Sequence, residues 1–409
     1  MNNSTTAKEN KQIKKLMNRN ILLTYINSGL MWGRFFIPVL ALFYIASKVP
    51  LQQFTIIMGV FSLVIVIFEI PSGVIADLLG RKNALLISRL LFLAEIFLIA
   101  FYNGFWIFLI AKIISGIGVS LTSGTTGSIL YDSLKNIKKE KEYRKHSSRV
   151  FLISNVSMAV IFIIGAYLFS INAKLPAILS LPLIGLGFIL TFFYTEPFVN
   201  KKKITIKNSM KHFKESMKYF TKNKYLWFLG FFSLAIVATI NIAMSMSSIY
   251  FVKILIPIYL IGIVACIANL IPAYSAKKTE SYEKIWGEKK LLMIVYFLVM
   301  IGILLMALMI PYIGILFYFI IMFIYGFFTV SVDYYVNKVA ISSHRTTLLS
   351  INNSFSNIGI ALLFPIVGYV STKYSLSTAY WMIGICLLFY AVFLIHYAIS
   401  IKLYTKKNS

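Results

Sequence analysis

Glu69-Ile-Pro-Ser-Gly73-Val-Ile-Ala-Asp77-Leu-Leu-Gly80-Arg81-Lys82 is the stretch of sequence that decides how this chain folds. Gly73 and Asp77 are four residues apart, so they share one face of a helix, and we expect Gly73 to let a neighbouring helix approach closely. Asp77, at the end of that helix, can accept hydrogen bonds from the N-terminus of another helix. Gly80 permits a tight turn, and the basic pair Arg81 and Lys82 follows it. This spacing predicts a specialised turn between two helices rather than an ordinary basic loop.

The rest of the chain is unusually apolar. Of 409 residues, 59% are apolar and only 13% are charged, whereas soluble proteins are about 45–50% apolar and about 25% charged. The net charge is +27, but it comes with few charges of any kind, unlike the surface of a soluble nucleic-acid-binding protein. The composition therefore predicts a protein that crosses a membrane many times.

Twelve segments are long enough to cross about 30 Å of hydrocarbon, which takes about 20 apolar residues each. Six lie in residues 20–196 and six in 224–401, on either side of a Lys-rich central loop at 197–223, with tails at 1–19 and 402–409. Equal halves suggest an internal duplication, as in some transporters. The expected fold class is an all-α membrane protein with two pseudo-symmetric six-helix halves. The predicted spans are 20–46, 52–76, 84–102, 105–131, 150–170, 175–195, 224–247, 250–274, 291–310, 313–336, 347–371 and 376–401.

The basic residues predict the orientation of these spans. With the N-terminus in the cytoplasm, 33 of the 40 Lys and Arg residues fall in inner segments, four in outer loops and three inside spans. Such an asymmetry over short loops indicates that the basic side is cytoplasmic. We therefore expect both termini in the cytoplasm and most of the charge against anionic lipid headgroups, with no nucleic-acid partner.

The stretch at 69–82 resembles the signature of the major facilitator superfamily, G-x-x-x-D-x-x-G-R-K, in the loop between spans 2 and 3. The whole chain is similar to that family in its number of spans, its basic central loop and its cytoplasmic termini. Three further segments resemble bacterial members: Ser123 to Leu134, Thr195-Glu196-Pro197, and Arg345 to Ser350. The resemblance implies a multi-pass secondary transporter in a bacterial inner (plasma) membrane, and not an enzyme.

The resemblance also implies a cytoplasmic latch. In the family, the aspartate and arginine of this loop pair with an acidic residue that ends span 4, and the aspartate faces the start of span 11. The matching residues here are Asp77, Arg81 and Asp132. The latch holds the outward-open state, and protonation of either acid would weaken it, so it would act as a bistable element biased by charge.

The second half is expected to hold a faded copy of this latch. Gly287-Glu288-Lys289-Lys290 aligns with the first turn, which places Lys284 at the position of Asp77 and Glu288 at that of Arg81. We therefore expect the copy to have lost its latch chemistry. Asp333 is either the counterpart of Asp132 or a helix-end charge in the headgroup layer.

Ionisable residues inside spans are candidates for function, because a charge at membrane depth is costly. Arg34 lies near the middle of span 1, Glu95 near the middle of span 3 and Lys112 in the outer third of span 4. Arg34 can hold an anionic substrate group or pair with Glu95, and Glu95 can carry a proton. The alternative for both is a permanent structural ion pair. Glu69 and Arg89 lie at one depth, and we expect them to form a structural pair.

Neighbouring positions extend these candidates. Asn27 and Arg34 share a predicted polar helix face of span 1, which in the family lines the central cavity. Lys112 stands where the resemblance implies a span-4 arginine tied to proton transfer, but lysine can lose its proton when buried and arginine cannot. In the second half the candidates are Asn241, Tyr325 and Asp333, among methionine and aromatic residues. A cavity with few charges and many aromatics suits amphipathic molecules.

Together these features predict proton-driven export of amphipathic small molecules, including drugs, by a monomeric carrier without a cofactor or metal. Export rather than import rests on the resemblance. One alternative is an importer or exchanger of an organic anion that uses Arg34 and Lys112 as a clamp. Another is a membrane enzyme or a non-transporting sensor, but no polar catalytic cluster is evident at either membrane face. The sequence also has no glycine-rich phosphate loop followed by Lys-Ser/Thr.

Overall fold

The computed structural model describes the backbone of residues 2–197, 206–341 and 344–401; within it, the side chains of residues 2–10, 70, 77, 206–210, 212 and 346 lie outside the described part. All regular elements of the described chain are helices. Ten of them are long and apolar enough to cross a membrane. The predicted tail at 402–409 and part of the central loop lie outside the described residues.

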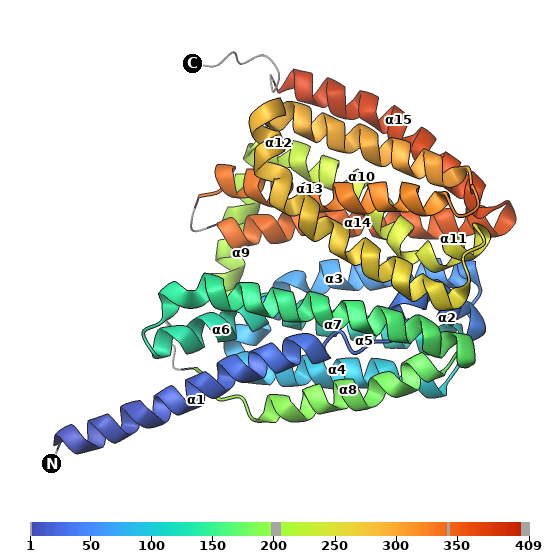
Figure 1. The fold of residues 1–409 in the computed structure, drawn as a ribbon. Helices are drawn as coiled ribbons and strands as arrows, with labels where there is room; N and C mark the ends of the chain where they lie inside the picture. Colours follow the sequence, from blue (N-terminus) through green and yellow to red (C-terminus); the bar gives the residue numbers. More distant parts are fainter. Residues whose placement is uncertain (1, 198–205, 342–343, 402–409) are drawn as a thin grey trace.

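The elements up to residue 192 lie together in the lower part of Figure 1, and those from 224 onward lie in the upper part. The helix that follows the undescribed residues 198–205 joins the two on the left. The first group comprises α1 (Asn2–Leu30), η1 (Ile37–Val39), α2 (Leu40–Ala46), α3 (Leu51–Leu79), α4 (Arg81–Phe101), α5 (Phe105–Thr122), α6 (Thr125–Asn136), η2 (Glu140–Glu142), α7 (Tyr143–Ile171) and α8 (Leu175–Phe192). The second comprises α9 (Ile206–Lys222), α10 (Lys224–Ser245), α11 (Ser247–Lys253), α12 (Ile258–Ala307), α13 (Gly314–Val339), α14 (Arg345–Lys373) and α15 (Leu376–Ser400).

Three predicted spans differ from the observed helices. The span predicted at 20–46 is broken between Leu30 and Ile37, and its helix α1 already begins at Asn2, inside the predicted tail. The span predicted at 105–131 is divided into α5 and α6, because Gly124 adopts the left-handed conformation (φ +73°). A break of this kind leaves backbone groups without helical partners, which is tolerated at membrane depth only where protein surrounds them.

The third difference concerns the hairpin predicted near residues 248–249. Helix α11 continues past this point to Lys253, and the next helix starts only at Ile258, after Pro257. Leu255 turns the chain with a φ of +67°. Helix α12 then runs to Ala307 with one non-helical residue, Gly287 (φ +74°), which divides it into two helical pieces. The serines near residue 247 were therefore not the turn signal, whereas Pro257 was; the break at Gly287 is the turn that the sequence predicted there.

The two groups of helices meet along two pairs, α3 against α14 and α7 against α12. Glycines allow these contacts: a Cβ at Gly368 of α14 would overlap Thr55 of α3, and a Cβ at Gly262 of α12 would overlap the carbonyl oxygen of Phe162 in α7. Near the same end, α2 contacts α11. The interface between the groups is therefore closely packed at the end where α3 begins.

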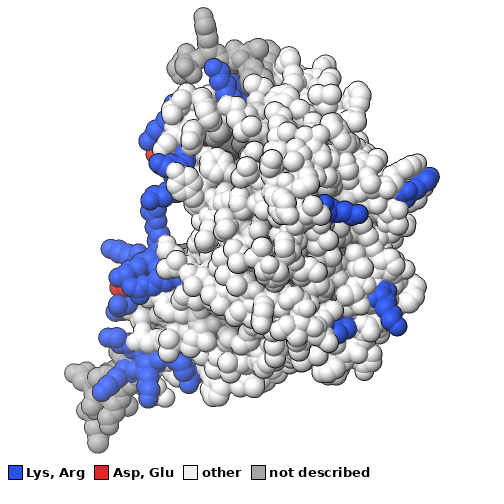
Figure 2. Space-filling model, turned by 45° about the vertical axis from the view of Figure 1, so that its right-hand side comes forward, with Lys and Arg blue, Asp and Glu red and all other residues white. Residues whose placement is uncertain are grey.

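Basic side chains gather along one side of the molecule, and only a few isolated ones lie on the opposite side (Figure 2). Helix α1 begins and helix α15 ends on the left side of Figure 1. Lys14, Lys138, Arg144, Lys214 and Lys218 are exposed. The uneven distribution is the one that the sequence predicts for a membrane protein with its basic side in the cytoplasm.

Candidate functional site

The break in the first span places Arg34 in a non-helical segment between two helices. The Phe35 N–H donates to the hydroxyl of Ser180 in α8, 3.0 Å away. A Cβ at Gly165 of α7 would overlap the carbonyl oxygen of Phe35, so only glycine lets the segment lie this close. Arg34 is therefore positioned by neighbouring helices. The sequence predicted that Asn27 and Arg34 share one helix face. This prediction is wrong for Arg34, because the helix ends at Leu30.

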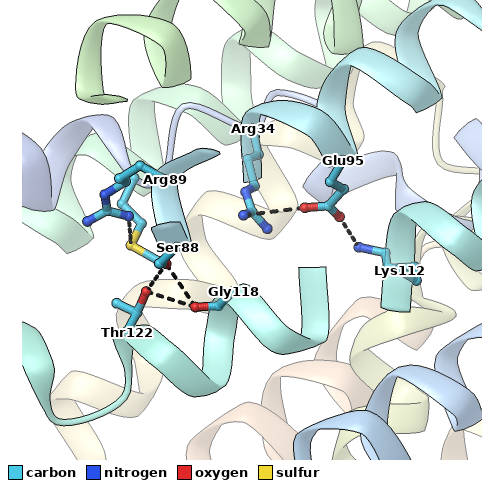
Figure 3. A network of polar contacts seen from close by, with 8 residues as sticks. Arg34, Ser88, Arg89, Glu95, Lys112, Gly118 and Thr122 are labelled. Atoms are coloured by element: carbon cyan, nitrogen blue, oxygen red, sulfur yellow. Dashed lines mark hydrogen bonds and ion pairs between the residues drawn. The ribbon is translucent and has the colours of Figure 1, made fainter. Parts of the chain in front are cut away.

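Glu95 of α4 is fully buried and lies between two basic side chains (Figure 3). Its Oε1 accepts a hydrogen bond from Lys112 Nζ of α5 at 2.7 Å, and its Oε2 lies 3.4 Å from Arg34 Nη2. The Lys112 and Arg34 side chains are 7% and 12% exposed. Arg34 and Glu95, which the sequence analysis considered as a possible pair, do lie together. Lys112 pairs with the same carboxylate.

Aromatic rings surround this charged cluster. The Arg34 guanidinium carbon lies 4.3 Å from the centroid of the Phe92 ring, and that of Arg89 lies 6.0 Å from it. Lys112 Nζ lies 5.3 Å from the centroid of Phe61. Cations over aromatic faces at these distances gain attraction that grows when water is absent. The rings therefore compensate part of the cost of burying the basic groups.

The pair predicted between Glu69 and Arg89 does not form. Glu69 Oε1 accepts a hydrogen bond from the hydroxyl of Ser350 in α14 at 3.1 Å. Arg89 Nη1 donates instead to the thioether sulfur of Met31, 2.7 Å away (Figure 3). The two residues share a depth but face different neighbours, which span depth alone does not reveal.

A second set of polar contacts fixes α4 against α5. The hydroxyl of Ser88 donates to the carbonyl oxygen of Gly118 at 2.8 Å and also contacts the hydroxyl of Thr122 (Figure 3). Ser88 is fully buried. Because Glu95 lies on α4 and Lys112 on α5, this contact holds the register of the two helices that carry the ion pair.

The signature turn between α3 and α4 forms a compact polar cluster. The guanidinium of Arg81 pairs with the carboxylate of Asp132 at the end of α6. Glu196, which follows α8, accepts hydrogen bonds from the backbone N–H groups of Arg81 and Lys82, both at 2.8 Å. Gly80 has a φ of +90°, and a Cβ there would lie 3.1 Å from the Glu196 carboxyl.

Glu196 is a residue to which sequence reasoning gave no role. A carboxylate at a helix N-terminus is stabilised by the free N–H groups and the helix dipole, and here it covers the first turn of α4. The segment Thr195-Glu196-Pro197 was the only sequence signal for this role of Glu196.

The side chain of Asp77 lies outside the described residues. No atom lies within 4 Å of a Cβ built at Gly73, so the close neighbour expected there is absent from the described structure.

Comparison with known proteins agrees with these features. The family model of the Major Facilitator Superfamily matches residues 21–339. This chain belongs to the major facilitator superfamily. It is 26% identical over 383 residues to an uncharacterized MFS-type transporter, YxaM, of Bacillus subtilis (strain 168), covering 88% of this chain and 90% of the relative. It is 22% identical over 207 residues, half of each chain, to the tetracycline resistance protein, class H, of Pasteurella multocida.

The fold is shared with solved MFS structures. The crystal structure of the nucleoside transporter NupG superimposes with a TM-score of 0.76 at 15% identity, covering 96% of this chain and 100% of that one. As a member of this family with ten candidate membrane spans among its described helices, this chain is a multi-pass transporter of small molecules, and not an enzyme.

In this MFS transporter the turn at Gly287 of the second half also carries an ion pair. Gly287, like Gly80, has a positive φ. Glu288 Oε2 accepts a hydrogen bond from Lys338 Nζ of α13 at 2.9 Å, and the Tyr225 hydroxyl also donates to Glu288. Glu288, which aligns with Arg81 in the sequence, thus pairs with a base on α13, whereas the loss of latch chemistry in this copy stays a prediction. The sequence signal was Lys338, near the end of span 10.

The remaining candidates of this MFS chain lie apart from the charged cluster. Asn27 is buried against Gly187 of α8, and Asn241 donates to the carbonyl oxygen of Val237 in its own helix. Tyr325 is partly buried, and Asp333 is exposed. Among the described residues, no hydrogen bond or ion pair joins these four to Arg34, Glu95 or Lys112. That Asp333 is the counterpart of Asp132 stays a prediction.

Proposed function

We propose that this chain has twelve spans in two six-span halves, residues 20–196 and 224–401, with both termini in the cytoplasm of a bacterium. Ten helices meet the length and composition of a span. Twelve result when α12 is counted as two spans divided at Gly287 and when α1, η1 and α2 together form the broken first span. The one-sided distribution of basic residues supports the orientation (Figure 2).

We further propose proton-coupled export of amphipathic small molecules by alternating access. The observation that carries this proposal is the fully buried Glu95 between Lys112 and Arg34. While ionised, Glu95 holds both cations. A proton on Glu95 removes that attraction and frees Lys112, so proton binding alters the charge that a substrate meets. Because the charge at the site differs between the ionised and protonated states of Glu95, the binding of the proton and the binding of the substrate affect each other.

The packing between the groups of helices supports alternating access. Close contacts lie toward the beginning of α3, where Thr55 meets Gly368 and Gly59 meets the carbonyl oxygen of Ala361. Farther along α3, Glu69 still bonds Ser350, but Gly73 has no neighbour within 4 Å. This arrangement fits a carrier closed at its outer end. Rocking the halves would part the outer contacts and bring a neighbour onto Gly73.

Export is favoured by the partial match to a tetracycline resistance protein. The coupling ion and the monomeric state are part of the same proposal. An importer of the same architecture would use the same buried charges, so direction must be measured.

The test uses purified full-length protein in liposomes with an acidic interior and a panel of amphipathic dyes outside. A proton antiporter should accumulate dye in the liposomes and stop when an uncoupler is added. Glu95→Gln should bind dye but lose most of the dependence on the gradient, whereas the exposed control Lys253→Gln should behave as wild type. Gradient-independent behaviour of the wild type across the panel, or full coupling in Glu95→Gln, would refute the proposal.

A further inference from the structure

The buried charges around Glu95 do not balance. Arg34, Arg89 and Lys112 are all at most slightly exposed. Arg34 and Lys112 share the buried carboxylate of Glu95, and Arg89 forms no ion pair with a described carboxylate. Among the described side chains, this leaves an excess of two positive charges near the middle of the membrane. Uncompensated charge at this depth is costly, so the excess suggests a missing anion.

The pairing shows which cations are left over. Lys112 takes Glu95 at hydrogen-bond distance, whereas Arg34 lies 3.4 Å from the other oxygen of the same carboxylate. Nε and Nη2 of Arg34 are buried without a hydrogen-bond partner. Arg89 is 5% exposed, and its hydrogen bond goes to the sulfur of Met31, which is a weak acceptor. Buried polar groups are normally fully bonded. The Arg34 guanidinium shares its one carboxylate with Lys112, and that of Arg89 has only a sulfur, so both can still accept a strong anionic partner.

These two guanidinium groups lie around one aromatic ring. Arg89, Phe92 and Glu95 are spaced three residues apart on α4, so they share a face. The Arg34 guanidinium approaches the Phe92 ring from the broken first span at 4.3 Å, and that of Arg89 lies 6.0 Å from the same ring. Figure 3 shows Arg34 next to Glu95, with Arg89 on the side of Arg34 away from the Glu95–Lys112 pair. Planar guanidinium forks match carboxylate and phosphate geometry, while Phe92 and Met31 add an apolar surface.

We propose that Arg34 and Arg89 bind the anionic group of the substrate, and that the substrate is therefore an amphipathic organic anion. This proposal rests on the transport site described above but not on the direction of transport. The Glu95–Lys112 pair stays available for the proton. Because the excess is two charges, a dianion neutralises the cluster and a monoanion does so only in part. An aryl phosphate, largely dianionic at pH 7.5, should bind more tightly than an aryl carboxylate of similar size.

The test measures binding to the purified full-length protein by thermal shift and by calorimetry. The probes share one ring system: 2-naphthyl phosphate, 2-naphthoate, neutral 2-naphthamide and cationic 2-naphthylmethylamine. Saturable binding should follow the order phosphate, carboxylate, amide, with no binding of the amine. Arg34→Gln and Arg89→Gln should each weaken phosphate binding about tenfold or more, equivalent to about 1.4 kcal/mol. Equal binding of the amide and the two anions by the wild type would overturn the proposal.

Matched variants separate a lost contact from a lost fold. Arg34→Lys and Arg89→Lys keep the charge but lose the fork, so each should bind more weakly than wild type and better than the Gln variant. Lys253→Gln, an exposed cation, should bind as wild type. Should the Gln variants fail to fold, the order of the four probes in the wild type still decides. Anion binding without gradient-driven transport would refute the proposed function alone, and gradient-driven transport of dyes without anion binding would refute this inference alone.

Discussion

Glu95 is fully buried, and its two oxygens face different basic side chains. Burying two opposite charges yields little net stability, but removing one partner leaves the other uncompensated. The stability of the first helical group should therefore depend on the balance of charge at this position more than on the ion pair itself.

We expect Glu95→Gln to lower the free energy of unfolding by about 3–5 kcal/mol, because Lys112 is left buried without its counter-charge. The double variant Glu95→Gln/Lys112→Met should recover most of this loss, since it removes both charges. Thermal unfolding of the purified variants in detergent measures the difference. A double variant no more stable than the single one would show that the pair itself provides the stability.

At the scale of elements, glycines decide how closely helices approach. Gly165 of α7 faces the backbone of the broken first span, whereas Gly73 of α3 has open space around it. The two positions are a matched pair for testing whether the described contacts hold the fold.

We expect Gly165→Ala to destabilise the protein by about 1–3 kcal/mol, because a backbone carbonyl cannot move aside as a side chain can. Gly73→Ala should leave stability unchanged or raise it by up to about 1 kcal/mol, as alanine favours a helix. Thermal unfolding distinguishes the two. If Gly73 contacts a neighbour in the other transport state, Gly73→Ala should nevertheless slow transport; wild-type transport would exclude such a contact.

Two ion pairs at the turns also belong to this scale, and we expect both to act as latches. Arg81 pairs with Asp132 in the first half, and Glu288 pairs with Lys338 in the second, with the charges reversed. The second pair is partly exposed, with side chains 22% and 54% accessible, so its contribution to stability is small, about 0.2–1 kcal/mol. Its effect should appear in the balance between transport states.

We expect Glu288→Lys and Lys338→Glu each to reduce the transport rate, because each places like charges together. The double variant Glu288→Lys/Lys338→Glu should restore the rate, as it makes the second latch resemble the first. Transport of one dye by all four proteins in liposomes measures this. Failure of the double variant to exceed either single variant would mean that the pair has no role as a latch.

At the scale of the whole molecule, the distribution of basic residues predicts the topology. In a background without Cys266 and Cys386, single cysteines at positions 48 and 253 should react with an impermeant maleimide in intact cells. Cysteines at positions 138 and 214 should react only after permeabilisation, because the basic side faces the cytoplasm. Labelling of position 138 in intact cells would reverse the proposed orientation.

Much of the architecture could be predicted from the sequence because the bilayer imposes simple requirements. Apolar length indicates spans and the position of lysine and arginine indicates sides. The signature at 69–82 pointed to the family to which the chain belongs. Local breaks were harder: the interruption near Arg34 and the turn before Ile258 depend on glycine and proline signals within otherwise apolar runs.

Side-chain partners were decided by the tertiary structure. The sequence showed that Arg34, Arg89, Glu95 and Lys112 lie at membrane depth, but depth does not give the direction in which a side chain points. The fold turns Lys112 toward Glu95, turns Glu69 toward Ser350 and leaves Arg89 with the sulfur of Met31. The sequence by itself therefore determined which charges are buried, because the cost of a charged side chain depends on whether its segment lies in water or in the hydrocarbon of the bilayer. Only the tertiary structure decided which of them are paired, because pairing depends on the rotation and register of helices that are distant in the chain.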